Sequence, residues 1–304
     1  MDFDENMPGA AAGQVIAGCY EVVRPLGHGG MGKVFLVVDR TTGQQYAMKI
    51  LRGQWQENER VIARFAREVR ALRQLNHPCI VKVFDARRDG DVLYFTMEYI
   101  EGKTVRKWLQ ERKRLALGSV VRVLCLVARA LEYAHQITIH RDISPDNIMV
   151  QKDGSVRLLD FGLAKLEDAN QGLTMVGVSM GRMQYNAPEQ RRNAADVDHR
   201  ADIYSLGVCF FEMLTGKRPK PGREMLEMRP DLPREALDFY KKATAEDREE
   251  RFQTAREFRE ELMALYRRTH APQPRAGLGA GFLHWLRDAL SNVRTLSRKR
   301  RAGK

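Results

Sequence analysis

The stretch 140–162 constrains this chain more than any other part of the sequence. It begins with His140–Asp142 (His-Arg-Asp), continues with Asn147, and ends with Asp160–Gly162 (Asp-Phe-Gly). The apolar runs beside these positions are typical of strands, so two carboxylates and one amide are close in sequence on an expected β scaffold. Carboxylate and amide oxygens are the ligands that a hard divalent cation prefers. The stretch therefore predicts a polar site suited to Mg²⁺.

The composition limits the number of domains and indicates the cellular compartment. The chain has 304 residues, 43% of them hydrophobic, which is enough to bury the core of one large domain or two. Its cysteines are scattered without a CxxC pair, which argues against a zinc site or disulfides and favours a reducing compartment. No signal peptide is expected at the acidic N-terminus, and the longest apolar run, 120–131, is interrupted by two arginines. We therefore expect a cytoplasmic protein without a membrane span.

The apolar periodicity divides the chain into a strand-rich part and a helix-rich part. The expected strands are 20–26, 33–39, 45–51, 80–87 and 92–100, with one helix at 59–75. After Gly102 the expected elements are helices at 120–135, 201–214, 233–243 and 254–266. Strands followed by helices predict an α+β architecture with two lobes, 19–101 and 102–266, and a ligand cleft between them.

A glycine-rich turn lies upstream of a lysine in the strand-rich part. Gly27, Gly29 and Gly32 separate two expected strands, and Lys49 is in the next strand. Backbone amides can approach phosphate oxygens closely only where side chains are absent. The turn alone is equally compatible with a simple hairpin, so its position before Lys49 is what favours phosphate binding.

Taken in order, the glycine turn, Lys49, the three motifs of stretch 140–162 and Ala187–Glu189 (Ala-Pro-Glu) match the signature motifs of protein kinases. Over roughly residues 19–266 the chain resembles a bacterial protein kinase of the eukaryotic-like serine/threonine class. The resemblance implies a bilobal protein-kinase-like fold, ATP and Mg²⁺ as cofactors, and transfer of the γ-phosphate to serine or threonine. The acceptor would be a protein substrate or the chain itself.

The resemblance also implies roles for the matching residues. Asp142 is expected to be the catalytic base, Asn147 and Asp160 to bind Mg²⁺, and Lys49 to contact the α- and β-phosphates while paired with Glu68. Read from its helix alone, Glu68 is also compatible with a solvated position. The expected nucleotide contacts are Gly27, Gly29, Gly32, Val34, Ala47, Lys49, Met97 (the gatekeeper), Glu98, Ile100 and Met149.

Further roles implied by the resemblance are structural or regulatory. Glu189 is expected to pair with Arg251, and Asp202 to anchor the backbone of the catalytic loop. Arg141 is expected to bind a phosphate on the activation loop, where Thr174 is the predicted site ahead of Ser179.

Three departures from the family pattern lie on the substrate side. Ser144 stands in place of the usual lysine, and Arg182 in place of the usual threonine. Between Gly216 and Pro233 only 224–228 has room for a turn of helix. The departures are open to three interpretations: drift without effect on the chemistry, compensation in which Arg182 supplies the charge that Ser144 lacks, or a kinase with itself or one dedicated partner as substrate. They also keep a pseudokinase, a nucleotide-binding scaffold, as the alternative.

The ends of the chain differ from its centre. Residues 1–18 are expected to be disordered, and 271–281 are typical of a linker. Residues 267–304 contain ten Lys or Arg residues and one acidic residue, which gives +9 of the chain's +12. Apolar residues recur at helical spacing over 282–296, and this basic tail, 282–301, could contact a membrane surface, dock on the kinase domain or remain solvated. Nucleic-acid binding through 298–301 is the other alternative, but no specific binding is expected.

Overall fold

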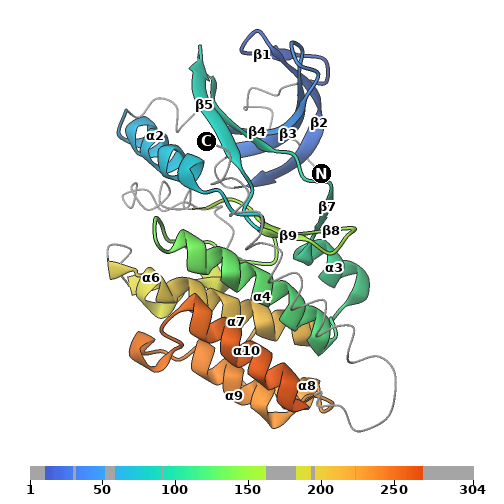
Figure 1. Cartoon of the computed structure of the whole chain (residues 1–304), viewed down its shortest axis with the longest axis vertical. Helices are drawn as coiled ribbons and strands as arrows, with labels where there is room; N and C mark the ends of the chain where they lie inside the picture. Colours follow the sequence, from blue (N-terminus) through green and yellow to red (C-terminus); the bar gives the residue numbers. More distant parts are fainter. Residues whose placement is uncertain are drawn as a thin grey trace, which may run out of the picture.

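The computed structural model of the protein describes residues 11–29, 32–51, 59–90, 92–161, 183–192, 196–222 and 224–269. They form two lobes, with a curled sheet and one helix above a group of helices (Figure 1). The predicted α+β architecture with a β-rich first lobe and a helical second lobe is confirmed. In these ranges no helix is long and apolar enough to cross a membrane.

The upper lobe is built on a six-stranded antiparallel sheet of order β1-β2-β3-β4-β6-β5. Its strands are β1 (Val15–Ile16), β2 (Tyr20–Gly29), β3 (Gly32–Asp39), β4 (Gln45–Leu51), β5 (Val83–Asp89) and β6 (Val92–Glu98). Lys49 lies in β4, opposite Val34 of β3 and Phe95 of β6. Pro25 has no amide hydrogen to donate, and the register of β2 shifts between Pro25 and Gly27, so the strand continues past it.

The start of the sheet differs from the expected boundary at residue 19. Val15 and Ile16 pair with Glu21 and Tyr20, so 11–18, expected to be disordered, includes a short strand. Ile16 is only 5% exposed because it packs on an apolar cluster of the sheet. The prediction for 1–18 was based on the overall composition of the segment, in which two adjacent apolar residues, Val15 and Ile16, have little weight. For this reason the short strand was not predicted.

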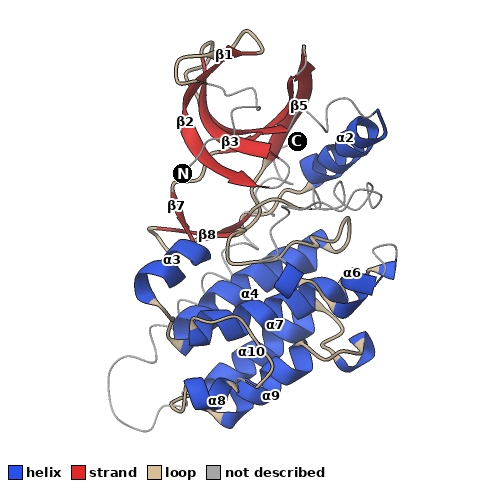
Figure 2. Ribbon diagram, turned by 180° about the vertical axis from the view of Figure 1, so that it is seen from behind, coloured by secondary structure: helices blue, strands red, loops and turns tan. Residues whose placement is uncertain are grey.

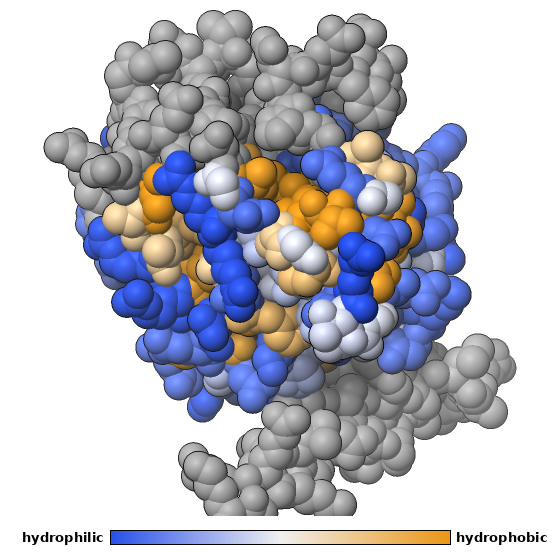
Figure 3. Space-filling model, turned by 90° about the horizontal axis from the view of Figure 1, so that it is seen from above, coloured by the Kyte–Doolittle hydropathy of each residue, from blue (hydrophilic) through white to orange (hydrophobic). Residues whose placement is uncertain are grey.

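The two faces of the upper sheet bury different side chains, because side chains alternate along a strand. Helix α2 (Glu59–Gln74) lies beside the upper sheet (Figure 2). Its Phe65 packs on Phe95 of β6, with 6.0 Å between ring centroids. Met48 and Ile50 belong to a second cluster on the opposite face. Seen from above, apolar residues of this lobe lie among hydrophilic ones (Figure 3). Lys49 alternates with Met48 and Ile50, so it shares a face with α2.

A small antiparallel sheet lies between the lobes; strands beside the motifs of 140–162 were expected, but their bounds and their pairing into this sheet were not predicted. It consists of β7 (Gly102–Thr104), β8 (Ile148–Gln151) and β9 (Val156–Leu158). Helix α3 (Val105–Arg112), also not predicted, follows β7 directly, and the hydroxyl of Thr104 caps it by accepting from the amide of Lys107 at 3.3 Å. Asn147 immediately precedes β8, and Asp160 lies just beyond β9 (Figure 1). The hairpin β8-β9 thus positions both predicted metal ligands.

Helices α4 (Leu117–Ala134) and α7 (Arg200–Thr215) form the centre of the lower lobe, and most of their residues are buried. Helices α9 (Arg234–Ala243) and α10 (Ala255–Thr269) pack against them. All four lie within a few residues of their predicted ranges. The short helices are α6 (Pro188–Arg192) and α8 (Met225–Met228), and α8 is the single turn anticipated in 224–228. Burial of apolar side chains, at about 1.5–3 kcal/mol each, is the main stabilising contribution.

Candidate active site

The side chain of His140 joins the catalytic loop, 140–147, to the segment after β9. Its Nδ1 accepts a hydrogen bond from the amide of Asp142 at 3.2 Å, and its Nε2 donates to the carbonyl of Leu159 at 2.8 Å. An amide only donates and a carbonyl only accepts, so the imidazole is neutral with its proton on Nε2. The ring also packs on Phe161, with 4.4 Å between centroids. His140 therefore fixes Asp142 relative to the strand end that carries Asp160.

Asp202 of α7 holds the start of the catalytic loop from below. One carboxylate oxygen accepts from the amide of Arg141 at 2.7 Å, and the other from the amide of His140 and from Nε2 of His135, both at 2.9 Å. Burial alone would raise the pKa of Asp202, but the hydrogen bonds from His135 and from the backbone amide of His140 lower it. The predicted anchoring role of Asp202 is confirmed.

Two residues of the site have a left-handed backbone. Arg141 has φ of 66° and Asp160 has φ of 52°. A residue other than glycine in this region costs on the order of 1–3 kcal/mol and persists only where its surroundings hold it. Hydrogen bonds supply that restraint at Arg141, and an ion pair with Lys49 does so at Asp160. Backbone strain of this kind is concentrated at functional sites.

Asn147 connects the predicted base to the predicted metal site. Its Nδ2 donates to the carbonyl of Asp142 at 2.7 Å and to Oδ2 of the same residue at 2.9 Å. Its own carbonyl accepts from the amide of Leu159 at 2.9 Å, which brings Asn147 next to Asp160. Asn147 is 3% exposed, so these contacts are well shielded from water. The structure thus brings together Asp142, Asn147 and Asp160, as the sequence motifs suggested.

Lys49 reaches this group from the upper lobe. Its Nζ lies 2.9 Å from Oδ2 of Asp160, and the two side chains are 8% and 22% exposed. Among the described residues, the ion-pair partner of Lys49 is Asp160, whereas the resemblance implied that Lys49 pairs with Glu68. Glu68 is half-buried on α2 and makes other contacts. The Lys49–Glu68 pair therefore stays a prediction.

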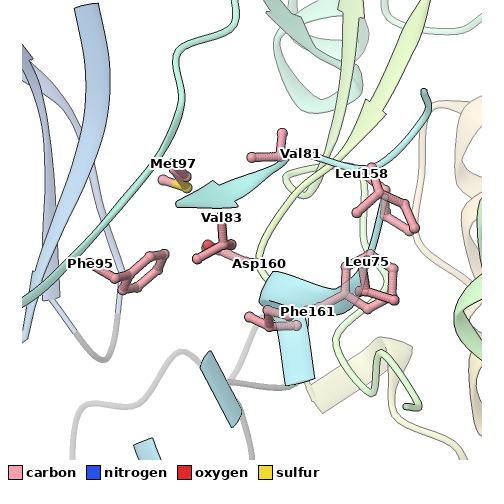
Figure 4. Close-up of a pocket in the computed structure, with 10 residues that line it drawn as sticks. Leu75, Val81, Val83, Phe95, Met97, Leu158, Asp160 and Phe161 are labelled. Carbon is pink, nitrogen blue, oxygen red and sulfur yellow. The ribbon is translucent and has the colours of Figure 1, made fainter. Parts of the chain in front are cut away.

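The residues predicted to surround adenine come from four strands and the segment between the lobes. Val34 lies on β3, Ala47 on β4, Met97 and Glu98 on β6, Ile100 just beyond β6, and Met149 on β8. Ala47 and Met97 are directly opposite each other in the sheet. Met97 also lines a small pocket with Phe95, Asp160 and Phe161 (Figure 4). This position is compatible with a gatekeeper, which stays a prediction.

The predicted phosphate-binding glycines are not equivalent. A Cβ at Gly32 would lie 1.9 Å from the carbonyl oxygen of Ile50, so only glycine fits beside β4. A Cβ at Gly27 would meet nothing within 4 Å. Gly29 pairs with Gly32 at the end of the hairpin. The space around Gly27 is therefore open, while packing of the sheet is sufficient to explain Gly32, and phosphate binding by the glycines stays a prediction.

Glu189 and Arg251 form a buried bidentate ion pair, as predicted. The two guanidinium nitrogens lie 2.7 and 2.9 Å from the two carboxylate oxygens, and the side chain of Arg251 is fully buried. Burial alone would raise the pKa of Glu189, but the hydrogen bonds and charge of Arg251 lower it. The pair attaches α6 to the base of the lower lobe.

The substrate side of the site is only partly described. Ser144 is fully buried, and within the described ranges its hydroxyl has no hydrogen-bond partner. Arg182, Thr174 and Ser179 lie outside the described residues.

Two groups of contacts around the catalytic loop were not predicted. Gln190 donates to the carbonyl of Arg141 at 3.0 Å. Arg106 of α3 donates to Asp146 at 3.2 Å, to Glu212 at 2.7 Å and to the hydroxyl of Tyr185 at 2.6 Å. These partners of Arg106 lie between 40 and 106 residues away in the sequence, so no local pattern could have indicated them. The adjacency of Gln190 to Ala187–Glu189 was the only signal for its role.

Comparison with known proteins agrees with this geometry. Residues 20–281 match the model of the protein kinase domain. The chain is 34% identical over 284 residues to the probable serine/threonine-protein kinase PknB of Bifidobacterium longum, which covers 85% of this chain and 40% of that protein. It is 31% identical over 270 residues to the serine/threonine-protein kinase PrkC of Bacillus subtilis, covering 84% and 41%.

Solved structures give the same answer for the fold. The PknI kinase domain of Mycobacterium tuberculosis, in a doubly mutated form, superposes with a TM-score of 0.72 at 31% identity, covering 85% of this chain and 100% of that one. The unmutated domain gives a TM-score of 0.69 at 30% identity, with 84% and 99% covered. The chain spans about two fifths of the length of the curated relatives named above. The chain belongs to the protein kinase family.

Proposed function

We propose that the protein transfers the γ-phosphate of ATP to serine or threonine hydroxyls of a protein substrate, of itself, or of both. The observation that carries this proposal is a series of contacts: Asn147 donates to Asp142, the backbone of Asn147 bonds Leu159, and Asp160, the next residue, pairs with Lys49. These residues would supply a base, two oxygen ligands and a cation close together. Such an arrangement suits phosphoryl transfer, in which positioning and charge stabilisation dominate catalysis.

Asp142 would orient the attacking hydroxyl and accept its proton. Its Oδ2 accepts a hydrogen bond from the side-chain Nδ2 of Asn147 at 2.9 Å. Its backbone N–H donates to Nδ1 of His140 at 3.2 Å. The carboxylate therefore needs little reorganisation when a substrate hydroxyl arrives. Preorganisation of this kind lowers the barrier without new chemistry from the protein.

The donor set of the site fits Mg²⁺. Mg²⁺ is usually held by one or two protein oxygens together with phosphate oxygens and water, and here Asn147 and Asp160 would supply the protein ligands. Bound Mg²⁺ would neutralise charge on the phosphates. Lys49 would add a second positive charge from the upper lobe.

Other assignments are proposals from the sequence. We infer a cytoplasmic enzyme whose kinase domain spans about residues 19–266. The basic tail, 282–301, is the candidate segment for a membrane surface. Thr174 would be the regulatory phosphosite facing Arg141, and Arg182 would supply charge near Asp142. The curated relatives are much longer, so the substrates and partners of the whole protein are proposals too.

The variant Asp142→Asn tests the proposed function. We expect it to abolish ATP-dependent autophosphorylation, followed with radiolabelled phosphate, while leaving Mg·ATP binding within about twofold in a thermal-shift titration. Asp146→Asn is the matched control, because Asp146 lies in the same loop and is half-buried like Asp142. This variant should keep most of the activity. Activity of Asp142→Asn within about tenfold of the parent would contradict the proposal. If the parent binds Mg·ATP but transfers no phosphate, the protein is a nucleotide-binding scaffold.

A further inference from the structure

The peptide group that joins Arg141 to Asp142 is held at both of its polar atoms. Its N–H, on Asp142, donates to Nδ1 of His140 at 3.2 Å. Its carbonyl, on Arg141, accepts from Nε2 of Gln190 at 3.0 Å. The backbone on the N-terminal side is the strained one, with φ of 66° at Arg141. Rotation of this peptide group would move the side chain of Asp142, so Gln190 bears directly on the direction in which the base points.

The amide of Gln190 is itself oriented by a second contact. Its Oε1 accepts from the amide of Ala187 at 3.0 Å, while its Nε2 donates to Arg141. The NH₂ group of a glutamine side chain must face an acceptor and its carbonyl oxygen must face a donor. The oxygen and nitrogen of this side chain therefore cannot be exchanged. At neutral pH, glutamate of the same length could accept from Ala187 but could not donate to Arg141. The position therefore requires a terminal group with both a donor and an acceptor.

The helix that carries Gln190 is rigidly attached to the lower lobe. The preceding residue, Glu189, forms the bidentate pair with buried Arg251. Just upstream, the carbonyl of Tyr185 accepts from the hydroxyl of Ser205 of α7 at 2.8 Å. Gln190 is thus fixed by its own helix and connects 185–190 to the catalytic loop.

We propose that Gln190 is a positioning residue, which holds the Arg141–Asp142 peptide group so that the carboxylate of Asp142 faces the substrate hydroxyl. This inference rests on the proposed kinase function. The catalytic loop is thus contacted from two sides: Phe161, just beyond β9, packs on His140, and 185–190 contacts the loop through Gln190.

The test compares Gln190→Glu with the parent at saturating Mg·ATP. At neutral pH the introduced carboxylate faces the carbonyl of Arg141 without a hydrogen to donate, so kcat is expected to fall by about tenfold or more. The affinity for Mg·ATP, from thermal-shift titration, should stay within about twofold, because the hydrogen bonds of Gln190 go to Ala187 and Arg141 and not to a predicted nucleotide residue. Gln110→Glu, at an exposed position of α3, is the control for the added negative charge.

Lowering the pH supplies a readout that a purely structural role would not change. Protonation of the carboxylate introduced by Gln190→Glu restores a donor, so the ratio of variant to parent kcat should rise as the pH falls toward about 5. The charged groups nearby, Arg141, Asp202, Glu189 and Arg251, are common to both enzymes and cancel in the ratio. A ratio that is flat with pH, or a kcat equal to that of the parent, would overturn the proposal.

A second variant covers the case in which Gln190→Glu does not fold. Gln190→Met has a similar length but neither donor nor acceptor, and it should lower kcat with a melting temperature close to that of the parent. A lowered melting temperature with unchanged kcat per folded molecule would show that Gln190 only stabilises the lobe. If the parent itself transfers no phosphate, the proposed function fails, and the role of Gln190 is then refuted with it.

Discussion

Nζ of Lys49 and Oδ2 of Asp160 lie 2.9 Å apart and join the upper sheet to the end of β9 in the lower lobe. The residues are 111 positions apart in the sequence, and no backbone hydrogen bond links their strands. The pair places a positive group from the upper lobe directly beside a negative group that follows β9. We therefore expect Lys49 to contact phosphate and Asp160 to bind the metal ion.

We expect Lys49→Met to lower kcat by about 10²–10³, because one charge contact to the transition state is lost. The variant also leaves the carboxylate of Asp160 without this partner, so Mg·ATP affinity should change too. Steady-state kinetics and thermal-shift titration measure both effects. Lys107→Met, at an exposed position of α3, is the matched control, and an equal effect of the two variants would exclude a specific role for Lys49.

We expect Glu189→Gln to destabilise the fold by about 3–5 kcal/mol, because it leaves the buried guanidinium of Arg251 uncompensated. Urea unfolding measures the change. In the double variant Glu189→Gln/Arg251→Met the loss should be clearly smaller than the sum of the two single losses, because the residues are coupled. Arg192→Ala removes an exposed pair with Glu246, 70% and 75% exposed, and should change stability by less than about 1 kcal/mol. Additive losses in the double variant would contradict the coupling.

The stability of the fold should depend on pH through His77. Burial, followed by the charges of Arg129 and Arg157, lowers the pKa of His77 from 6.5 to about 4. Since the folded pKa is the lower one, the unfolded chain binds the extra proton between pH 6.5 and 4. The stabilising contribution is complete above pH 6.5 and is lost as the pH falls toward 4, by up to about 3 kcal/mol.

The variant His77→Asn isolates this contribution. Asparagine keeps an acceptor for the amide of Cys79, which donates to Nδ1 of His77 at 3.1 Å, but it does not titrate. The difference in unfolding free energy between parent and variant, measured in urea from about pH 7.5 to 4, should shrink as the pH falls. Parallel curves over this range would show that His77 does not set the dependence. Glu132, which faces His77 from α4, is present in both proteins.

Ser144 and Arg182 allow a test of compensation. Ser144→Ala removes a buried hydroxyl that has no partner in the described ranges, so stability should stay equal or rise by about 1 kcal/mol. If Arg182 supplies the missing charge, Arg182→Ala should lower kcat by about 10²–10³, and Ser144→Lys with Arg182→Thr should recover much of that loss. Activity of Arg182→Ala equal to that of the parent would favour drift.

The elements that the sequence predicted well are those with long, uninterrupted patterns. Strand β4 has the predicted bounds, 45–51, because a turn precedes it and its apolar run is continuous. The apolar runs at β8 and β9 were expected to be strands, but β7, β8 and β9 have only three or four residues each, too few for a period to set their bounds or their pairing. The predicted strand 80–87 begins later, at Val83, since Ile80 forms only a bridge to Leu158.

The identity of the site residues followed from the order of the motifs, but their partners did not. Asp142, Asn147 and Asp160 were named together because they are close in sequence. The contact of Gln190 with Arg141 spans 49 residues and depends on how α6 lies against the catalytic loop. Whether Lys49 pairs with Asp160 or with Glu68 depends likewise on where α2 lies. Only tertiary structure fixes either contact.

The close approach of Gly32 to Ile50 affects how related chains should be classified. A Cβ at this position would overlap a backbone oxygen of the neighbouring strand whether or not a nucleotide is bound. A pseudoenzyme that has lost ATP binding would therefore still need glycine here to form the hairpin. Glycine at this position should be scored as a marker of the sheet, and the diagnosis of an active relative should rest on its counterparts of Gly27 and Gly29.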